Sequence, residues 1–226
     1  MNNKNIMEYK KGDVWLNVGC GVSLANLPFT NVDNFFTLED LKKGKGKKGS
    51  PYKNARIPKG VKFVKADMCA LPFEDNCVDY IECNDAIEHL GIFQVETALR
   101  EFYRVLKSGG KLGMSTTNFD EIARLWTLNV TGSLFKTQED MNRYVMLAKI
   151  TYGNQAGPGE YHKVPFNPAA IAYFLNTAGF KLDNITIHIF PTNSLDRMPQ
   201  LAYKHHEKKL KNMIILSEMM WVEAIK

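Results

Sequence analysis

The chain has 226 residues, 45% of them hydrophobic, which is enough for one full core and a small appendage. Its net charge of +5 is mild and permits an anionic partner without requiring one. Residues 1–11 are polar, without the apolar segment of a signal peptide, and no apolar run approaches the ~18 residues of a membrane helix, so we expect no membrane partner.

The cysteine pattern bears on metal binding and compartment. Cys20, Cys69, Cys77 and Cys83 form no Cys-x-x-Cys pair, and three of them lie in predicted strands or strand ends. This pattern is typical of reduced thiols and argues against a zinc site or a disulfide framework. We therefore predict no metal ligands and a cytoplasmic location.

A short apolar run over residues 14–18 ends in the turn Gly19-Cys20-Gly21. An apolar run bounded by glycine is typical of a strand buried on both faces. Glycines just past such a strand let the backbone bend and approach a ligand, and open α/β sheets bind ligands at the carboxyl ends of their strands. We expect a nucleotide-like cofactor here, although Gly-x-Gly alone also closes ordinary strands.

Residues 22–28 leave little room for the helix that usually follows this turn, and Pro28 would end one. Residues 29–33 are predicted to form a second strand ending in Asp33. A carboxylate in this position can accept hydrogen bonds from both ribose hydroxyls. Asp33 follows Gly21 more closely than the roughly 20 residues of the usual fingerprint, which indicates a shortened crossover. The alternative for Asp33 is a turn or cap residue.

Residues 34–60 are predicted to be an insertion. Its lysine- and glycine-rich part, residues 42–50, is expected to be a mobile loop. Neither this loop nor the flanking Leu41 is expected to join a core. A basic flap over an anionic substrate is the functional alternative. The run contains no aromatic residues to stack bases, which argues against nucleic acid as a partner.

Two further strands each end in polar residues. After the predicted strand 61–65, Asp67 can accept from an adenine amine while Met68 contacts the ring. Asp67 could equally cap a turn. The predicted strand 78–83 is followed by Asn84 and further polar residues, which places them at the same edge of the sheet.

Residues 94–107 carry one apolar stripe and are predicted to form a helix that ends at Ser108-Gly-Gly. Residues 111–116 are predicted to be a fifth strand. The alternation of strands with a helical segment over 14–116 is typical of a parallel α/β sheet with right-handed crossovers.

An ordered set of motifs resembles the class I S-adenosylmethionine-dependent methyltransferases, close to a small predicted group with a compressed segment between the glycine turn and Asn-Val-Asp. The motifs are Leu16 to Gly21, Asn31 to Asp33, Ala66-Asp67, Leu71 to Ile81, Glu88 to Leu90 and Leu99 to Lys111. They cover about residues 13–118, half of the chain.

The resemblance implies S-adenosylmethionine as cofactor and an α/β fold: a Rossmann-like, seven-stranded, mostly parallel sheet flanked by helices, with a small helical and loop lid after strand five. It places the methionine moiety at Gly19 and Gly21, the ribose at Asp33, the adenine at Asp67 and Met68, and the sulfonium near the Asn84 backbone. Asn17 and Cys20 complete the implied cofactor-binding set.

The sequence departs from the family pattern in three places: Ser23 stands at the third glycine position, the first helix is missing, and the lysine-rich insertion is long. The first two affect contacts to the methionine carboxylate. A nicotinamide enzyme is disfavoured because the full Gly-x-Gly-x-x-Gly pattern is absent.

Beyond residue 118, the ranges 119–128 and 138–150 are predicted helices, joined by a linker at 130–133. The glycine-rich loop 152–166 contains Tyr152, Tyr161 and His162, which we expect to contact substrate. His162, and next His89, are candidate bases for the acceptor, because a near-neutral pKa suits proton removal. Each could instead be a loop or turn residue bonded to backbone.

The C-terminal part is predicted to contain a helix over 168–178, which Asn167-Pro168 opens and Gly179 ends. A strand over 180–190, a basic helix over 201–217 and a last strand over 219–225 are predicted to follow. The resemblance implies that this last strand inserts antiparallel between strands five and six. We expect a single domain, 1–226, with a cofactor-binding core at 13–118, a substrate lid at 119–166, and a segment at 167–226 that completes the sheet.

The expected reaction is methyl transfer to a small-molecule or glycan-type acceptor. A nucleic-acid or protein methyltransferase and a cofactor-binding module without catalysis remain as alternatives. The sequence identifies neither the acceptor nor the oligomeric state.

Overall fold

The computed structural model describes residues 8–46, 48, 52–53, 55–130, 138–155, 159–189 and 219–226. The strands are β1 (Trp15–Val18), β2 (Phe29–Asp33), β3 (Lys62–Lys65), β4 (Val78–Asn84), β5 (Leu106–Thr117), β6 (Ile185–Ile189) and β7 (Met219–Ile225). The helices are α1 (Leu38–Gly44), α2 (Ile92–Val105), α3 (Phe119–Val130), α4 (Gln138–Tyr152), α5 (Pro168–Ala178) and the short 3-10 helices η1 (Ile87–His89) and η2 (Leu182–Asn184). The predicted helix 201–217, most of the predicted linker 130–133 and parts of 42–50 lie outside the described residues.

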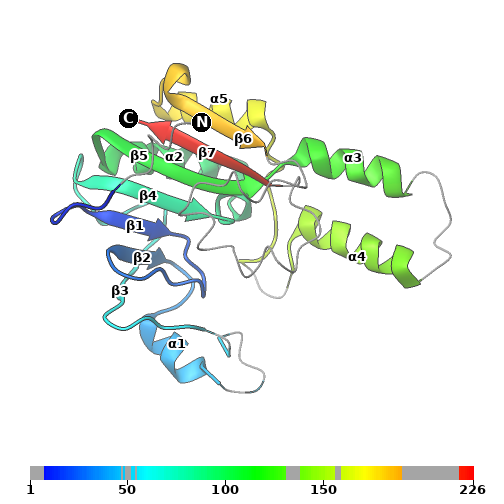
Figure 1. The fold of residues 1–226 in the computed structure, drawn as a ribbon, viewed down its shortest axis with the longest axis horizontal. Helices are drawn as coiled ribbons and strands as arrows, with labels where there is room; N and C mark the ends of the chain where they lie inside the picture. The colour runs from blue at the N-terminus through cyan, green and yellow to red at the C-terminus, as the bar shows by residue number, and fades with distance from the viewer. Residues whose placement is uncertain are drawn as a thin grey trace.

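The strands form one seven-stranded sheet in the order β3-β2-β1-β4-β5-β7-β6. The strands β1 to β5 pair in parallel, whereas β7 runs antiparallel to both of its neighbours, β5 and β6. This confirms the predicted fold class and the insertion of the last strand between the fifth and sixth. The arrowheads of β1 and β4 point toward the side where α3 and α4 project (Figure 1).

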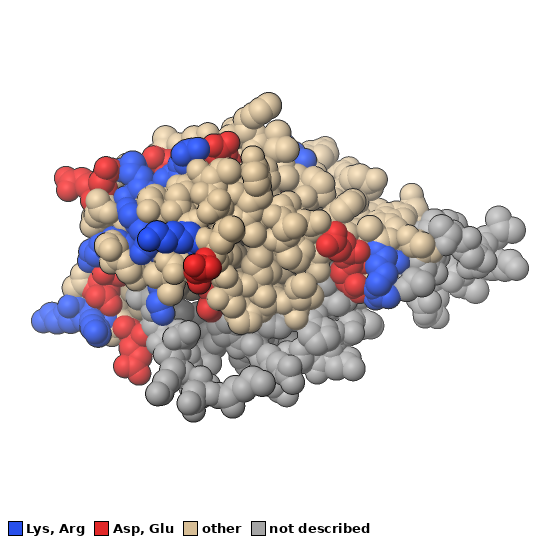
Figure 2. All heavy atoms as spheres, turned by 90° about the horizontal axis from the view of Figure 1, so that it is seen from above, with Lys and Arg blue, Asp and Glu red and all other residues tan. Residues whose placement is uncertain are grey.

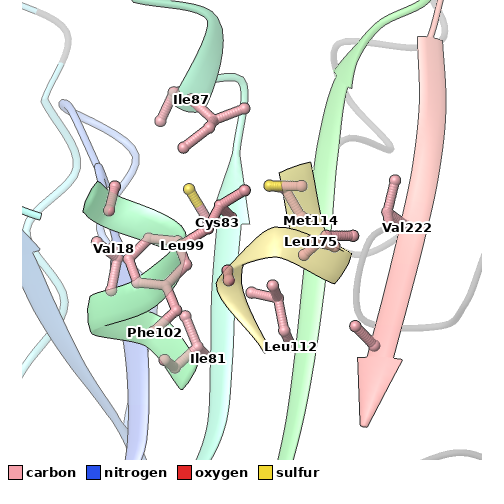
Figure 3. Packing of buried hydrophobic residues seen from close by; sticks show 14 of the residues in the cluster. Val18, Ile81, Cys83, Ile87, Leu99, Phe102, Leu112, Met114, Leu175 and Val222 are labelled. Atoms are coloured by element: carbon pink, nitrogen blue, oxygen red, sulfur yellow. The ribbon is translucent and has the colours of Figure 1, made fainter. Parts of the chain in front are cut away.

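The main core lies between the sheet and the helices α2 and α5. The predicted apolar stripe of α2 is fully buried, at Val95, Ala98, Leu99, Phe102 and Val105. In Figure 3, side chains of α2 and α5 meet those of β4, β5 and β7. The contact explains why β4 and β5 carry apolar residues on this face: each buried side chain of this size contributes roughly 1.5–3 kcal/mol.

Local signals fix the ends of α5 as predicted. The Asn167 side chain accepts from the Ala170 amide at 2.8 Å, Pro168 occupies the first turn, and Gly179 closes the helix in the left-handed conformation at φ 118°. The end of α2 differs from the prediction. The helix stops at Val105, and the Ser108-Gly-Gly segment lies within β5, beside a register shift against β4.

Two buried asparagines hold the short connection between β1 and β2, which contains no helix, as predicted. Asn31 is fully buried, and its Oδ1 accepts from the Ala25 amide at 2.7 Å and from Asn17 Nδ2 at 2.8 Å. Its Nδ2 donates to the Ala25 and Lys62 carbonyls at 3.1 Å. Asn17 also donates to the Ser23 carbonyl. These bonds supply the backbone partners that a first crossover helix would otherwise provide.

Replacing Asn31 by Ala is expected to lower the free energy of unfolding by about 2 kcal/mol, because several buried polar groups lose their partner together. Urea unfolding of this variant measures the loss. Asn184→Ala, which removes an exposed side-chain bond to the Ile225 carbonyl, serves as the control and should cost far less. Equal stability of the two variants would contradict the role assigned to Asn31.

The insertion after β2 contains the short helix α1, which ends at Gly44. The prediction that residues 42–50 are all loop is therefore wrong for residues 42–44. In a capping box at the start of α1, the Thr37 Oγ1 accepts from the Asp40 amide and Asp40 Oδ2 accepts from the Thr37 amide. The side chain of Leu41 is fully buried in a small cluster with Cys20, Phe36 and Ala55. The expectation that Leu41 joins no core is therefore also wrong.

The helices α3 and α4 pack against each other within the predicted lid, 119–166. Their bounds match the predicted helices to within two residues at either end. Trp126 Nε1 donates to Thr151 Oγ1 at 2.8 Å across the pair, and the Phe119 amide donates to the Phe166 carbonyl at 2.7 Å. The second bond fixes where the hairpin leaves the sheet. Residues 180–184 differ from the predicted strand, because η2 precedes β6.

Candidate functional site

The turn after β1 bends back over the end of β2. The amides of Gly19 and Cys20 both donate to the Val32 carbonyl, at 2.9 and 3.2 Å. Gly19 and Gly21 have positive φ angles, 67° and 48°, which favour glycine. The turn therefore lies directly beside the end of β2, where Asp33 follows.

Asp33 is buried and held by backbone donors on both oxygens. Its Oδ2 accepts from the Gly21 amide at 2.9 Å, and its Oδ1 accepts from the Phe35 amide at 2.9 Å. These bonds fix the orientation of the carboxylate and link it to the glycine turn. A carboxylate has about four acceptor positions, so two amide bonds leave capacity for ribose hydroxyls.

Asp67 lies at the neighbouring strand end, one strand further out. Its Oδ1 accepts from the Cys69 amide at 2.8 Å, and its Oδ2 is 3.5 Å from Asn34 Nδ2. Because Asn34 follows Asp33 directly, the two predicted acids lie along one edge of the sheet rather than on opposite sides. The structure thus brings Asp33, Asp67 and the glycine turn together.

Met68 and the tip of β4 complete this edge. A Cβ placed on Gly19 would lie 2.5 Å from the Ala86 Cβ and 3.1 Å from the Met68 Cε, so both residues reach the turn. A Cβ on Gly21 would meet nothing within 4 Å. The turn is therefore closed on the side of β4 and open beside Gly21.

Three of the predicted cofactor residues use their side chains elsewhere. The Cys20 thiol is buried in the small cluster around Leu41, and burial, with the nearby Asp33, raises its pKa far above the usual value. The side chain of Asn17 serves the β1–β2 connection. Asn84 Nδ2 donates to Glu82 Oε1 at 2.5 Å, and its Oδ1 accepts from Ser115. For these three, only the backbone is available for the predicted contacts.

Glu82 is a buried carboxyl group next to the site. Desolvation raises its pKa to about 7 from an ordinary 4.5, and the hydrogen bond from Asn84 opposes this shift only in part. Because the pKa is higher in the folded than in the unfolded protein, protonation of Glu82 contributes to the free energy of unfolding. This contribution is complete below pH 4.5 and is lost as the pH rises through 7.

Glu82→Gln is therefore expected to stabilise the protein near pH 8 by up to about 3 kcal/mol and to change little near pH 4. The Gln amide oxygen can still accept from Asn84, so the packing is kept. Urea unfolding at both pH values measures the difference. Glu39→Gln, at an exposed residue paired with Lys43, is the control and should show no such pH dependence. If Glu82→Gln and wild type have the same free energy of unfolding at both pH values, the pKa of Glu82 is not raised.

The histidines predicted as bases meet just beyond the β4 tip. Their ring centroids are 4.9 Å apart, at an interplanar angle of 67°. His89 Nδ1 lies 3.1 Å from the Tyr161 carbonyl, and His162 Nδ1 lies 2.8 Å from the Ile150 carbonyl. A carbonyl can only accept, so each Nδ1 carries the donated proton and Nε2 is left as the basic nitrogen. Desolvation, followed by His89, lowers the pKa of His162.

Glu88 joins this pair; it stands in the motif Glu88 to Leu90, but the sequence assigns it no role in the site. Its side chain is almost fully buried, and Oε2 accepts from Thr116 Oγ1 at 3.0 Å. Its carbonyl accepts from the Lys163 amide at 2.8 Å and, more weakly, from the Val164 amide at 3.4 Å. These backbone bonds tie η1 to the lid loop and bring His162 to His89. The signal in the sequence is the acid directly before a histidine, Glu88-His89.

The two predicted substrate tyrosines position the histidines through their backbone. The Tyr152 carbonyl accepts from the His162 amide at 3.1 Å, and the Tyr161 carbonyl faces His89. Both tyrosine side chains are exposed. The same loop also reaches the segment just after β2, because a Cβ on Gly159 would lie 2.9 Å from the Phe35 ring. The lid loop therefore contacts both the histidine pair and the residues next to Asp33.

The residues at this edge fit an adenosyl group. Asp33 offers an oriented carboxylate, Met68 offers an apolar contact, and the space beside Gly21 lets a ligand approach the backbone. No helix among the described residues is long and apolar enough to cross a membrane.

Comparison with known proteins agrees with this geometry. A methyltransferase domain family matches residues 16–114. The chain is 42% identical over 60 residues to a ubiquinone/menaquinone biosynthesis C-methyltransferase of Citrobacter koseri, covering 26% of this chain and 23% of that protein. It is 33% identical over 117 residues to a sterol 24-C-methyltransferase of Schizosaccharomyces pombe, covering 48% and 29%. The matched segments thus span less than a third of these relatives.

Solved structures extend the likeness to the whole fold. A SAM-dependent methyltransferase from Archaeoglobus fulgidus superposes with a TM-score of 0.53 at 17% identity, covering 96% of this chain and 87% of that one. The matched segment contains β1 to β4 and α2, with the glycine turn and both acids, and the fold agrees over the rest of the chain. Residues 16–114 thus match a methyltransferase domain family, and the whole chain has the fold of S-adenosylmethionine-dependent methyltransferases.

Proposed function

We propose that this chain transfers the methyl group of S-adenosylmethionine to a hydroxyl group of a small-molecule or glycan-type acceptor. The observation that carries the proposal is the group of His89, His162 and Glu88 just beyond the β4 tip. A hydroxyl oxygen is a weak nucleophile until its proton leaves, so an oxygen acceptor profits from such groups, whereas a neutral amine can attack without them.

The cofactor would lie along the edge formed by β1 to β4. Asp33 would accept from the ribose hydroxyls, Asp67 from the adenine amine, and Met68 would contact the ring. Bound there, the cofactor supplies an activated methyl group and departs as a neutral thioether. The backbone at Asn84 then lies between the adenosyl site and the histidines, which supports an acceptor held by the lid, 119–166.

The main task of the chain in this reaction is alignment. The acceptor oxygen bonds to the methyl carbon as the carbon–sulfur bond breaks, the electron pair stays on sulfur, and the hydroxyl proton leaves on the histidine side. Fixing the geometry of such a reaction can supply roughly 7–11 kcal/mol of the barrier. The hydrogen bonds between Glu88 and residues 163–164 support such an alignment, because they hold the loop that carries His162 beside η1.

The relatives are named for carbon acceptors in quinone and sterol biosynthesis, which supports a small molecule but not a particular one. A nucleic-acid acceptor has little support. Lys43 pairs with Glu39 on α1. On the face shown in Figure 2, basic side chains lie next to acidic ones rather than in a separate patch.

Two measurements test the proposal. Calorimetry should show that S-adenosylmethionine binds, whereas NAD does not. A screen with methyl-labelled cofactor should then label hydroxylated small molecules or glycans in preference to amines, nucleic acids or proteins. Labelling confined to nucleic acid or protein would overturn the acceptor class. Tight cofactor binding with no transfer to any class would leave a binding module.

A further inference from the structure

Glu88, His89 and His162 form a group whose composition suits a cation. One potential ligand atom from each lies within 4.8 Å of those of the other two. Two imidazoles and one carboxylate are a donor set that divalent transition metals bind, with coordination positions left for a substrate. The four cysteines are all free thiols, and none belongs to the group.

The orientation of both rings matches that of metal-binding histidines. Such histidines usually donate the ring proton that is not at the metal to a backbone carbonyl or carboxylate, which fixes the tautomer. Here Nδ1 of His89 donates to the Tyr161 carbonyl and Nδ1 of His162 to the Ile150 carbonyl. Each Nε2 therefore keeps its lone pair, as a ligand must.

Glu88 is held in the same way. Its carboxylate is 1% exposed, and the Thr116 hydroxyl donates to Oε2 at 3.0 Å. A carboxylate can accept this bond and still bind a cation, because each oxygen has two lone pairs. Asp85 lies close enough to act electrostatically on His162, which adds negative charge beside the group.

The fold prepares this arrangement before any ion binds. The carbonyl of Glu88 accepts from the amides of Lys163 and Val164, so residues far apart in sequence are joined next to the ligand atoms. In a tetrahedral site with bonds of about 2.0–2.1 Å, ligand atoms lie about 3.4 Å apart. The group would thus contract by up to about 1.4 Å, which rotation of the side chains can supply.

We infer that Glu88, His89 and His162 bind one divalent transition-metal ion of the zinc class, with an open position for the acceptor oxygen. This departs from the absence of metal ligands predicted from the cysteine pattern. The metal site itself does not depend on the proposed function; only the role of the ion rests on it. An acceptor hydroxyl bound to the ion would lose its proton to water more readily, and the resulting oxygen would attack the methyl carbon. The imidazoles then act as ligands rather than as bases.

The test uses the chelator-treated, full-length protein titrated with CoCl2 alone, followed by competition with ZnCl2. We expect one Co²⁺ per chain, with the intense visible absorption of a low-coordinate site, displaced by Zn²⁺. His162→Gln, His89→Gln and Glu88→Gln should each weaken binding at least about tenfold. The matched control is His188→Gln, at a histidine on β6, and it should bind as wild type does.

The same samples separate this inference from the proposed function. Thermal unfolding without metal and calorimetry with S-adenosylmethionine check that each variant is folded. A wild-type spectrum equal to that of free Co²⁺, or unchanged binding in all three folded variants, would overturn the metal site even if methyl transfer is found. Specific metal binding without transfer to any acceptor would support the site and count against the proposed reaction alone.

Discussion

Replacing Asp33 by Ala is expected to weaken S-adenosylmethionine binding about 1,000-fold. The carboxylate is the only side chain in the described part of the chain whose two oxygens join the glycine turn and the end of β2. Hydrogen bonds to a charged group contribute about 1.5–3 kcal/mol each, and a ribose offers two hydroxyls. Calorimetric titration with the cofactor measures the loss.

The control for this experiment is Asp183→Ala, at an exposed acid of η2, which precedes β6 at the opposite edge of the sheet from β3. It should bind the cofactor as wild type does. Because Asp33 also accepts from two amides, its variant will lose some stability, so near-ultraviolet circular dichroism must show that it is folded. A folded Asp33 variant that binds within about tenfold of wild type would show that the ribose is held elsewhere.

The fold was predictable where neighbouring residues decide it. The stripe of α2 and the caps of α5 depend on residues a few positions apart, and both were predicted. Leu41 was missed for the opposite reason. Its burial needs Cys20 and Ala55, which come from other segments. The lysines around Leu41 give no information about these distant partners. The start of α1, in contrast, has a local signal, because Thr37 and Asp40 form its capping box.

The candidate site shows the same division. Asp33 and Asp67 could be paired from the sequence, because parallel strands bring their carboxyl ends to one edge. His89 and His162 were each named, but their contact was not. It depends on backbone bonds between Glu88 and residues 163–164, which no local pattern encodes. Asn31 was read as part of a motif, while its four hydrogen bonds inside the shortened crossover became visible only in the fold.

The glycine turn allows a prediction with an internal control, because its two glycines differ in one respect. Both have positive φ angles, so an Ala at either position costs about 1–2 kcal/mol of backbone strain. Only at Gly19 would the new methyl group meet other atoms, above all the Ala86 Cβ at 2.5 Å and then the flexible end of Met68 at 3.1 Å. Gly19→Ala should therefore lower the free energy of unfolding by about 4 kcal/mol, against about 1 kcal/mol for Gly21→Ala.

A double variant separates the two causes. Gly19→Ala combined with Ala86→Gly removes the opposing methyl group but keeps the strained φ angle, so it should recover about 2 kcal/mol relative to Gly19→Ala. Urea unfolding of the three variants and wild type provides the comparison. If Gly19→Ala and Gly21→Ala lose the same stability, the tip of β4 does not press against the turn. The side of the turn that faces β4 would then have to be closed by another residue, and Met68, whose Cε lies 3.1 Å from the same position, is the next candidate.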